Sequence, residues 1–369
     1  MSTDLLIDLD SRIPNIALGK ISTYNKMAGV NTVLANFNPH YSLKKAGKLP
    51  LFLNVPEDML YKADRVFCSV IFRKNLDKVY YLLSLRPDVI VGGVGWEENS
   101  LLPDYIDNLK PDYDLYDEDF IYSRINTRIA TREGIMKKAK MLVSAGIGRT
   151  SKGCVNHCEH CIVPVREGDF KQVCSISDLV NPKSRYLILL DNNFTADALF
   201  VDKVTEILEL DLIVNFTQGL DIRLLNEEKA ELLKGIKRLT DIHYAWDYVN
   251  HENSIITGIK TLSKFIKPKY QKCYLLCGFN TTFEEDYYRF RRLWEYGVTP
   301  YIMIYQANSE KDLQKWEKDY PLAHDERHFR ILRHFARYVN GYIFKTPECH
   351  NFKDYAPLSR DGLLEYVTC

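Results

Sequence analysis

The sequence predicts a protein of the α/β class, with a doubly wound N-terminal domain, a partial barrel of six βα units and a C-terminal helical segment. Two observations lead to this prediction. First, short apolar runs of strand length alternate with stretches of helical periodicity. Second, this alternation resumes after an acidic connector, with more regular spacing between the strands. We place the domains at residues 1–135, 136–310 and 311–369.

The N-terminal domain is predicted to be a Rossmann-like, doubly wound unit. Its first helix is expected between Pro14, which suits a first helical turn, and Gly29, which suits the position after the last turn. A second helix is predicted over 75–85, and the acidic stretch 101–120 is interpreted as a surface connector. Four apolar runs are predicted as buried parallel strands: residues 4–8, 31–36, 65–71 and 88–94.

Six further strand candidates follow, and helical patterns fill most of the gaps between them. One such helix is expected from Phe200, and another begins with a capping box formed by Thr282 and Glu285. Because a closed TIM-type barrel takes eight βα units, six units predict a partial barrel that is open on one side. The strands are predicted at residues 141–145, 186–190, 211–216, 241–246, 272–277 and 299–305.

The loop after the first barrel strand contains SKGCVNHCEHCIVPVREG, in which Cys154, Cys158 and Cys161 have C-x3-C-x2-C spacing. Ligands collect at this end of parallel strands, because the loops converge there and free backbone groups are exposed. No fourth cysteine is nearby to close a tetrahedral zinc site, although His157 or His160 could complete one. A cubane held by three thiolates instead leaves one iron open, as catalysis requires. We therefore favour an open iron–sulfur cluster over zinc.

This motif, its place in a six-unit βα barrel and the preceding domain resemble the radical S-adenosylmethionine (radical SAM) superfamily. The resemblance covers roughly residues 136–308, and the wider motif is similar to the branch with methylthiotransferases and enzymes that carry an N-terminal cobalamin-binding domain. One departure is His160, at a position where the family usually has an aromatic, apolar residue. The rival hypothesis is a non-catalytic zinc or iron–sulfur protein on the same scaffold.

The resemblance implies a [4Fe-4S] cluster held by the three cysteines and an external electron donor. In this family the amine and carboxylate of SAM chelate the open iron, and reductive cleavage yields methionine and a 5′-deoxyadenosyl radical. That radical would take a hydrogen atom from a substrate that the sequence does not identify. The hard chemistry belongs to the cofactor, while the protein orients SAM and excludes water. We assign no catalytic residue from the sequence.

The resemblance also implies SAM contacts at three further strand ends. Asp191 and Asn193 follow the second barrel strand, where the family places a short polar or acidic motif against the SAM amine. Gln218 and Arg223 follow the third strand and are assigned to the ribose hydroxyls and the carboxylate. Gly278, after the fifth strand, is assigned to close approach of adenine or ribose. Three alternatives stay open: an Asx turn at 191–193, an ion pair between Asp221 and Arg223, and a tight turn at Gly278.

Cobalamin is a possible second cofactor, because the order of the domains resembles the cobalamin-binding branch. The D-x-H-x-x-G motif is absent, however, and the only histidine of the domain, His40, lies in the wrong loop. A methylthiotransferase would carry a second three-cysteine cluster here, whereas the domain contains only Cys68. We favour a substrate platform over a domain that binds cobalamin without a histidine ligand. A cobalamin-dependent radical SAM methyltransferase remains an alternative.

Composition and charge indicate which partners and which cellular location to expect. Lys plus Arg and Asp plus Glu are equal at 49 each, so no global field favours nucleic acid or an anionic membrane as partner. We find neither a signal peptide nor an apolar run of membrane length, and expect a cytoplasmic protein without a membrane partner. The basic amphipathic segment 325–345 is expected to be a packed helix with a solvated face. Its alternative role is contact with an anionic substrate, a nucleotide or RNA phosphate.

Overall fold

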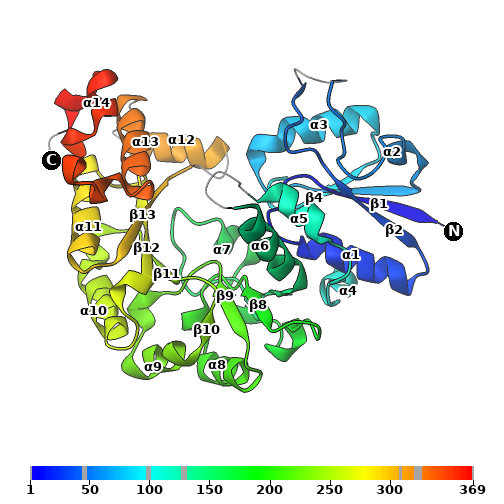
Figure 1. The fold of residues 1–369 in the computed structure, drawn as a ribbon, viewed down its shortest axis with the longest axis horizontal. Coiled ribbons are helices and arrows are strands. Elements are labelled where there is room, and N and C mark those ends of the chain that lie inside the picture. The colour runs from blue at the N-terminus through cyan, green and yellow to red at the C-terminus, as the bar shows by residue number, and fades with distance from the viewer. Residues whose placement is uncertain are drawn as a thin grey trace. The chain divides into compact units, whose positions relative to one another are not determined.

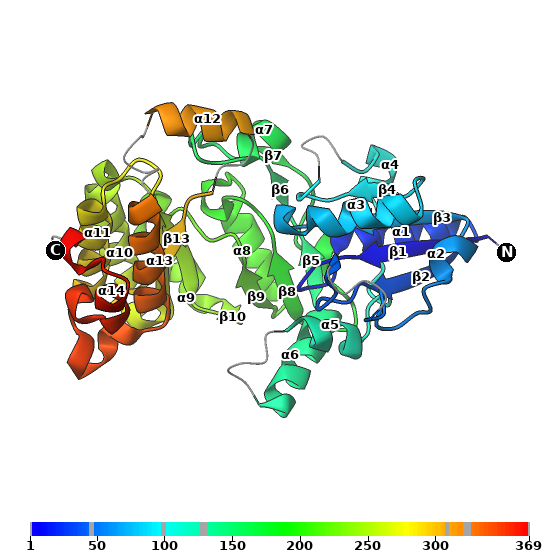
Figure 2. The same ribbon diagram turned by 90° about the horizontal axis from the view of Figure 1, so that it is seen from above.

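The chain is a mixed α/β protein with parallel sheets, as the computed structural model in Figures 1 and 2 shows. The structure describes residues 2–43, 48–96, 101–125, 131–306, 310–319 and 326–367. The chain divides into two compact units: unit 1 is Met1–Gly148 with Ser175–Ile188, and unit 2 is Arg149–Cys174 with Leu189–Cys369. Among the described residues, no helix is both long enough and apolar enough to span a membrane. The α/β class is confirmed, and the predicted domain boundaries stay predictions.

Unit 1 contains a parallel sheet with the strand order β2-β1-β3-β4. Its elements are β1 (Thr3–Asp8), α1 (Ile16–Met27), β2 (Asn31–Asn36), α2 (Met59–Lys62), β3 (Arg65–Ser69), α3 (Leu76–Leu85) and β4 (Ile90–Gly92). Leu5 and Ile7 of β1 share a core cluster with Leu82 of α3, whereas Leu6 packs with Leu18 of α1. Successive strand residues point to opposite faces, so both faces of the sheet are covered. This explains the continuous apolar runs from which the four strands are predicted.

Only the C-terminal end of the first helix is predicted correctly. Gly29 has φ +69° just beyond α1, a conformation that glycine adopts without strain. Pro14 lies outside the helix, so its expected place in the first turn is wrong. Asn15 caps α1 instead, because its side chain accepts a hydrogen bond from the N–H of Leu18 at 3.2 Å.

The expected strand at 141–145 is wrong, because these residues end a helix, α6 (Arg132–Ser144). The buried residues Ile135, Ala139 and Leu142 recur at helical spacing, and the Thr131 side chain accepts from the N–H of Gly134 at the N-terminus. The strand follows immediately, as β5 (Gly146–Gly148). The apolar run is therefore shared between the last helical turn and the strand.

The acidic stretch 101–120 is more than a surface connector. It contains α4 (Asp104–Asp107) and the start of α5 (Glu118–Arg124). Tyr116 and Phe120 are buried, and the Tyr116 hydroxyl donates to Oδ2 of Asp8 at 2.7 Å. The apolar and aromatic residues of this stretch thus pack into unit 1. The acidic composition of the stretch does not indicate this packing.

The remaining parallel strands lie in two sheets, with the orders β10-β9-β8-β5 and β11-β12-β13. Five of the six predicted strands are confirmed within one to two residues at their ends. A short additional strand, β10, pairs with the first residues of β9, and Leu220 beyond the end of β9 pairs with Tyr244 of β11. The strands are β8 (Tyr186–Leu189), β9 (Ile213–Phe216), β10 (Lys237–Arg238), β11 (Ile242–Trp246), β12 (Gln271–Cys277) and β13 (Thr299–Ile304).

Helices follow these strands in the order that the sequence predicts. The capping box of Thr282 and Glu285 is confirmed: the Thr282 hydroxyl accepts from the N–H of Glu285, and the Glu285 carboxylate accepts from the N–H of Thr282. Figure 1 shows α10 and α11 beside the β11-β12-β13 sheet. The helices are α8 (Phe200–Glu209), α9 (Glu227–Gly235), α10 (Glu252–Ser263) and α11 (Phe283–Glu295).

The predicted basic helix is α13 (Glu326–Asn340), and it packs against β13. Leu332 and Phe335 are fully buried, whereas Arg330 and Arg333 are exposed, so the expected packed helix with a solvated face is confirmed. The Asn340 side chain accepts from the N–H of Ile302 and donates to its carbonyl, and so pairs with the edge strand. Two further helices are α12 (Glu310–Asp319) and α14 (Ala356–Arg360).

Candidate functional site

The three cysteines lie in one long loop that joins the strands of a short antiparallel hairpin. The strands are β6 (Ser151–Lys152) and β7 (Lys171–Gln172), and the loop between them contains α7 (Val163–Glu167). Below the hairpin, the N–H of Val173 donates to the carbonyl of Thr150 at 2.8 Å. We call residues 153–170 the cysteine loop.

Glu167 closes the base of the cysteine loop. Its Oε2 accepts hydrogen bonds from the N–H of Gly153 at 2.9 Å and from the side chain of Asn192 at 2.7 Å. Its Oε1 forms an ion pair with Arg149 at 2.5 Å. Burial alone would raise the pKa of Glu167, but the Arg149 charge and these donors hold it below its ordinary value. The carboxylate therefore stays ionised and joins the two ends of the loop.

Gly153 is required at the start of the loop for two reasons. Its φ is +73°, and a Cβ there would lie 2.2 Å from the carbonyl oxygen of Asp169. Gly168, near the other end, has a similar φ of +70° but open space around the position of a Cβ. Both glycines allow the chain to turn, but only Gly153 also allows the two ends of the loop to touch.

All three cysteine thiols are partly buried, and those of Cys154 and Cys161 receive hydrogen bonds from the backbone. The N–H of Asn156 lies 3.4 Å from Sγ of Cys154, and the N–H of Val163 lies 3.5 Å from Sγ of Cys161. The pKa of Cys158 is raised to about 11, mainly by burial and also by the nearby Asp247 and Cys161, while Arg223 opposes the increase. Donors to sulfur stabilise thiolates, which are the form that binds metal.

Three cysteine thiols on one loop are the donor set that an open iron–sulfur cluster would require. Among the residues that the structure describes, no three His, Cys, Asp or Glu side chains are close enough to hold a single metal ion. A cubane makes a different demand, because each thiolate binds a different iron. The three thiols are within electrostatic reach of one another, since Cys154 and Cys161 both affect the pKa of Cys158. They also lie on a loop whose ends are fixed.

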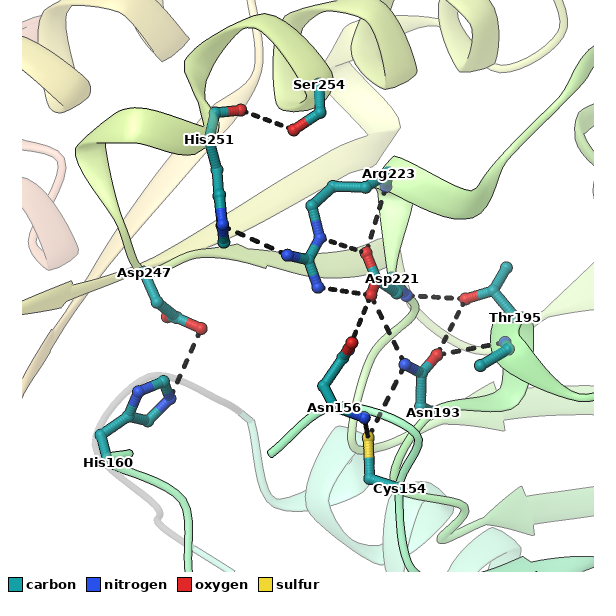
Figure 3. A network of polar contacts seen from close by, with 11 residues as sticks. Cys154, Asn156, His160, Asn193, Thr195, Asp221, Arg223, Asp247, His251 and Ser254 are labelled. Carbon is teal, nitrogen blue, oxygen red and sulfur yellow. Dashed lines mark hydrogen bonds and ion pairs between the residues drawn. The ribbon is translucent and has the colours of Figure 1, made fainter. Parts of the chain in front are cut away.

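A polar network surrounds Cys154, with side chains from the ends of two neighbouring strands (Figure 3). Asn193 follows β8, and its amide lies 3.8 Å from Sγ of Cys154 and 3.5 Å from Oδ2 of Asp221. Asp221 follows β9 and accepts from the side chain of Asn156 at 3.0 Å. The structure thus brings Asn193, which was assigned from the sequence, next to the first cysteine.

Arg223 extends this network. Its Nε and Nη2 donate to the two carboxylate oxygens of Asp221 at 2.8 and 2.6 Å, and its Nη1 lies 3.2 Å from Nδ1 of His251. The alternative of an ion pair between Asp221 and Arg223 is therefore confirmed. The pair holds the pKa of Asp221 below its ordinary value, although burial alone would raise it. The SAM-carboxylate role assigned to Arg223 stays a prediction.

His160, between the second and third cysteines, is held by the end of another strand. Its Nε2 lies 3.5 Å from Oδ2 of Asp247 (Figure 3). Its Nδ1 lies 3.3 Å from the hydroxyl of Tyr248. Its ring meets Phe279 edge to face, with ring centres 5.6 Å apart. The residue that departs from the family pattern thus keeps an aromatic contact and adds polar contacts to the strand end after β11.

Asp191 lies among buried donors of the chain itself. Its Oδ1 accepts four hydrogen bonds, from the N–H and the hydroxyl of Thr150 and of Ser151, at 2.6 to 3.0 Å. Only 3% of the residue is exposed. Asp191 therefore holds the segment that leads into the cysteine loop, and its assignment to the SAM amine stays a prediction.

Two other assigned residues lie apart from this network. Gln218 is exposed, and among the described residues no hydrogen bond of its side chain is seen. Gly278 has φ +75°, and a Cβ there would lie 2.6 Å from a methyl group of Leu332 in α13. The positive φ supports the tight-turn alternative for Gly278, and the approach of Leu332 is a second reason for glycine at this position.

Several residues of the site were not assigned from the sequence. Asp247 and Tyr248 directly follow a correctly predicted strand, so the rule that located Asn193 would have found them too. Asn156 and His251 have no such signal, because they lie in a loop and at the start of a helix. Their contact with Asp221 and Arg223 depends on packing alone.

The other cysteines in the described residues are mostly core residues, as the sequence predicts for three of them. Cys68, Cys273 and Cys277 are buried in strands, and burial raises the pKa of each thiol above its ordinary value. Cys349 is buried as well, and Cys174 is partly buried. Cys369 lies outside the described residues.

Comparisons with known proteins give no assignment: no protein-family model matches this chain, and a search of the curated proteins finds no match.

Proposed function

We propose that this protein is a radical SAM enzyme, in which Cys154, Cys158 and Cys161 hold a [4Fe-4S] cluster. One observation supports this function most strongly. The three cysteines lie on a loop with both ends pinned, beside a polar network that comes from the neighbouring strand ends. When bound, the cluster supplies the electron that cleaves SAM to methionine and a 5′-deoxyadenosyl radical.

The strand order supports a partial barrel of the kind that this function requires. β5, β8 and β9 are successive neighbours, and so are β11, β12 and β13. The pairing of Leu220 with Tyr244 joins the end of β9 to β11. Six strands would then run in chain order in one curved parallel sheet, with the cysteine loop after the first. In the N-terminal part, the order β2-β1-β3-β4 is that of doubly wound sheets.

Within this proposal, Asn193 and Arg223 are the side chains best placed to contact SAM. Asn193 lies against Cys154, and Arg223 presents Nη1 toward His251 while its other donors bind Asp221. Asp221 and Asn156 orient these groups through their own hydrogen bonds. Fixed dipoles and charges at such a site orient a bound ligand without reorganisation.

The test is anaerobic reconstitution of the purified chain with iron and sulfide, followed by reduction with dithionite as electron donor. We expect about four irons and four sulfides per chain, and 5′-deoxyadenosine from added SAM. Cys154→Ala, Cys158→Ala and Cys161→Ala should each abolish SAM cleavage, whereas Cys68→Ala, in the core of unit 1, should keep it. A colourless, zinc-loaded protein without SAM cleavage would support the rival hypothesis instead.

A further inference from the structure

Lys203, a residue of α8, connects both ends of the cysteine loop. Its Nζ donates to Oγ1 of Thr150 at 2.8 Å, just before β6, and to Oε1 of Gln172 at 2.7 Å, in β7. Nζ also forms an ion pair with the carboxylate of Asp197. An ammonium group has three N–H donors, so each donor of Lys203 has an acceptor.

The charged centre of this network is buried, whereas Gln172 at its edge is exposed. The side chains of Lys203 and Asp197 are 4% and 0% exposed. The Gln172 amide donates to Asp197 at 2.5 Å, and the Thr150 hydroxyl that accepts from Lys203 donates in turn to Asp191. Charges in such surroundings persist only where their partners are held in place. The network therefore fixes the residues on each side of the loop relative to α8.

We propose that Lys203 is a positioning residue, which holds the two ends of the cysteine loop together and thereby determines how firmly the loop retains its cluster. The part about the cluster rests on the proposed function. The part about the loop does not, because it concerns the metal-free chain. Groups that orient metal ligands from behind typically change metal affinity about ten- to a hundredfold.

The test uses the double variant Lys203→Met/Asp197→Asn in the full chain. The single variant Lys203→Met would leave Asp197 buried without a counter-charge and strongly destabilise the fold. The double variant removes both charges with little change in volume and keeps a side-chain oxygen that accepts from the N–H of Leu199. Hydrogen exchange of the metal-free protein measures the Val173 N–H, which donates to the Thr150 carbonyl. Loss of iron to a chelator measures retention after reconstitution.

We expect iron to be lost about ten- to a hundredfold faster in the double variant. The Val173 amide should also exchange faster than in the wild type. Lys20→Met is the matched control, because Lys20 forms a partly buried ion pair with Asp107 in unit 1. It should change neither rate. Unchanged exchange at Val173 in a folded double variant would refute the proposal. Faster exchange with unchanged iron loss would refute its cluster part, and a wild-type chain that takes up no iron would refute the proposed function instead.

Discussion

Single carboxylates hold the cysteine loop in place. Glu167 joins Gly153, Asn192 and Arg149 at the base of the loop, and Asp191 accepts from four donors just before it. A carboxylate suits this task because it offers about four acceptor positions and no donor. The two side chains fix the backbone that precedes the first cysteine.

Glu167 makes the stability of the protein depend on pH. Its pKa in the folded state is below its ordinary value, so its contribution is present above about pH 4.3 and is lost as the pH falls through the folded pKa. We expect the wild type to be more stable than Glu167→Gln at pH 7, with a difference that shrinks under acid. Urea unfolding of both proteins from pH 7 to pH 3 measures this. A difference that is constant over that range would contradict the assignment.

Two substitutions of Asp191 can separate its structural role, as an acceptor for Thr150 and Ser151, from its predicted role as a ligand of the SAM amine. Asp191→Ala leaves buried donors of Thr150 and Ser151 without an acceptor, so we expect a loss of about 2–4 kcal/mol in the free energy of unfolding. Asp191→Asn keeps one acceptor oxygen and should lose less than half of that. Calorimetric titration of the reconstituted Asp191→Asn protein with SAM then tests the charge. Unchanged affinity would show that the carboxylate does not bind the SAM amine.

At the scale of elements, the hairpin and the cysteine loop form one structure. The β6–β7 pair is only two residues long on each strand, too short to be stable without other contacts. Lys203, Glu167 and Asp191 supply those contacts from α8, from the loop itself and from the end of β8. These contacts hold the hairpin and the cysteine loop together.

The two glycines of the loop give a prediction with an internal control. In Gly153→Ala the new Cβ is strained by the positive φ and also clashes with the backbone of Asp169. In Gly168→Ala only the strain from the positive φ is present. We expect Gly168→Ala to lower the free energy of unfolding by about 1–2 kcal/mol and Gly153→Ala to lower it by clearly more. Gly153→Ala should also reduce the iron content after reconstitution. Equal effects of the two variants would show that the ends of the loop do not touch.

At the scale of the whole molecule, each unit has its own arrangement at the carboxyl ends of its strands. In unit 1 this edge is occupied by the chain itself. The Asp10 carboxylate accepts from the N–H groups of Ile71 and Phe72, and the Arg124 guanidinium donates to the carbonyls of Asp8 and Phe37. In doubly wound sheets, ligands bind near this switch point between β1 and β3.

We therefore expect the full chain not to retain cobalamin. His40 follows β2 and is exposed, and the N–H groups of Ile71 and Phe72 just beyond the end of β3 already donate to Asp10. Incubation with hydroxocobalamin, gel filtration and measurement of cobalt in the protein fraction test this. Stoichiometric cobalt would overturn the substrate-platform interpretation and favour the methyltransferase alternative.

The amino-acid sequence by itself determined the class of the fold and most of its elements. Buried apolar runs, the cap of α11 and Gly29 are local signals, because they depend on residues a few positions apart. The same local information misplaced the strand at 141–145, since one apolar run there serves the last helical turn and the adjacent strand. The C-x3-C-x2-C spacing of the three cysteines can also be read from the sequence alone.

Only the tertiary structure decided the partners of the polar side chains. Asp191 binds residues 40 and 41 positions away, and Asn156 meets Asp221 across 65 positions. The role of Lys203 likewise follows from contacts 31 and 53 positions distant. Polar groups choose partners by position and burial once distant segments pack, because a buried donor or acceptor without a partner is costly. Sequence periodicity carries no information about those distances.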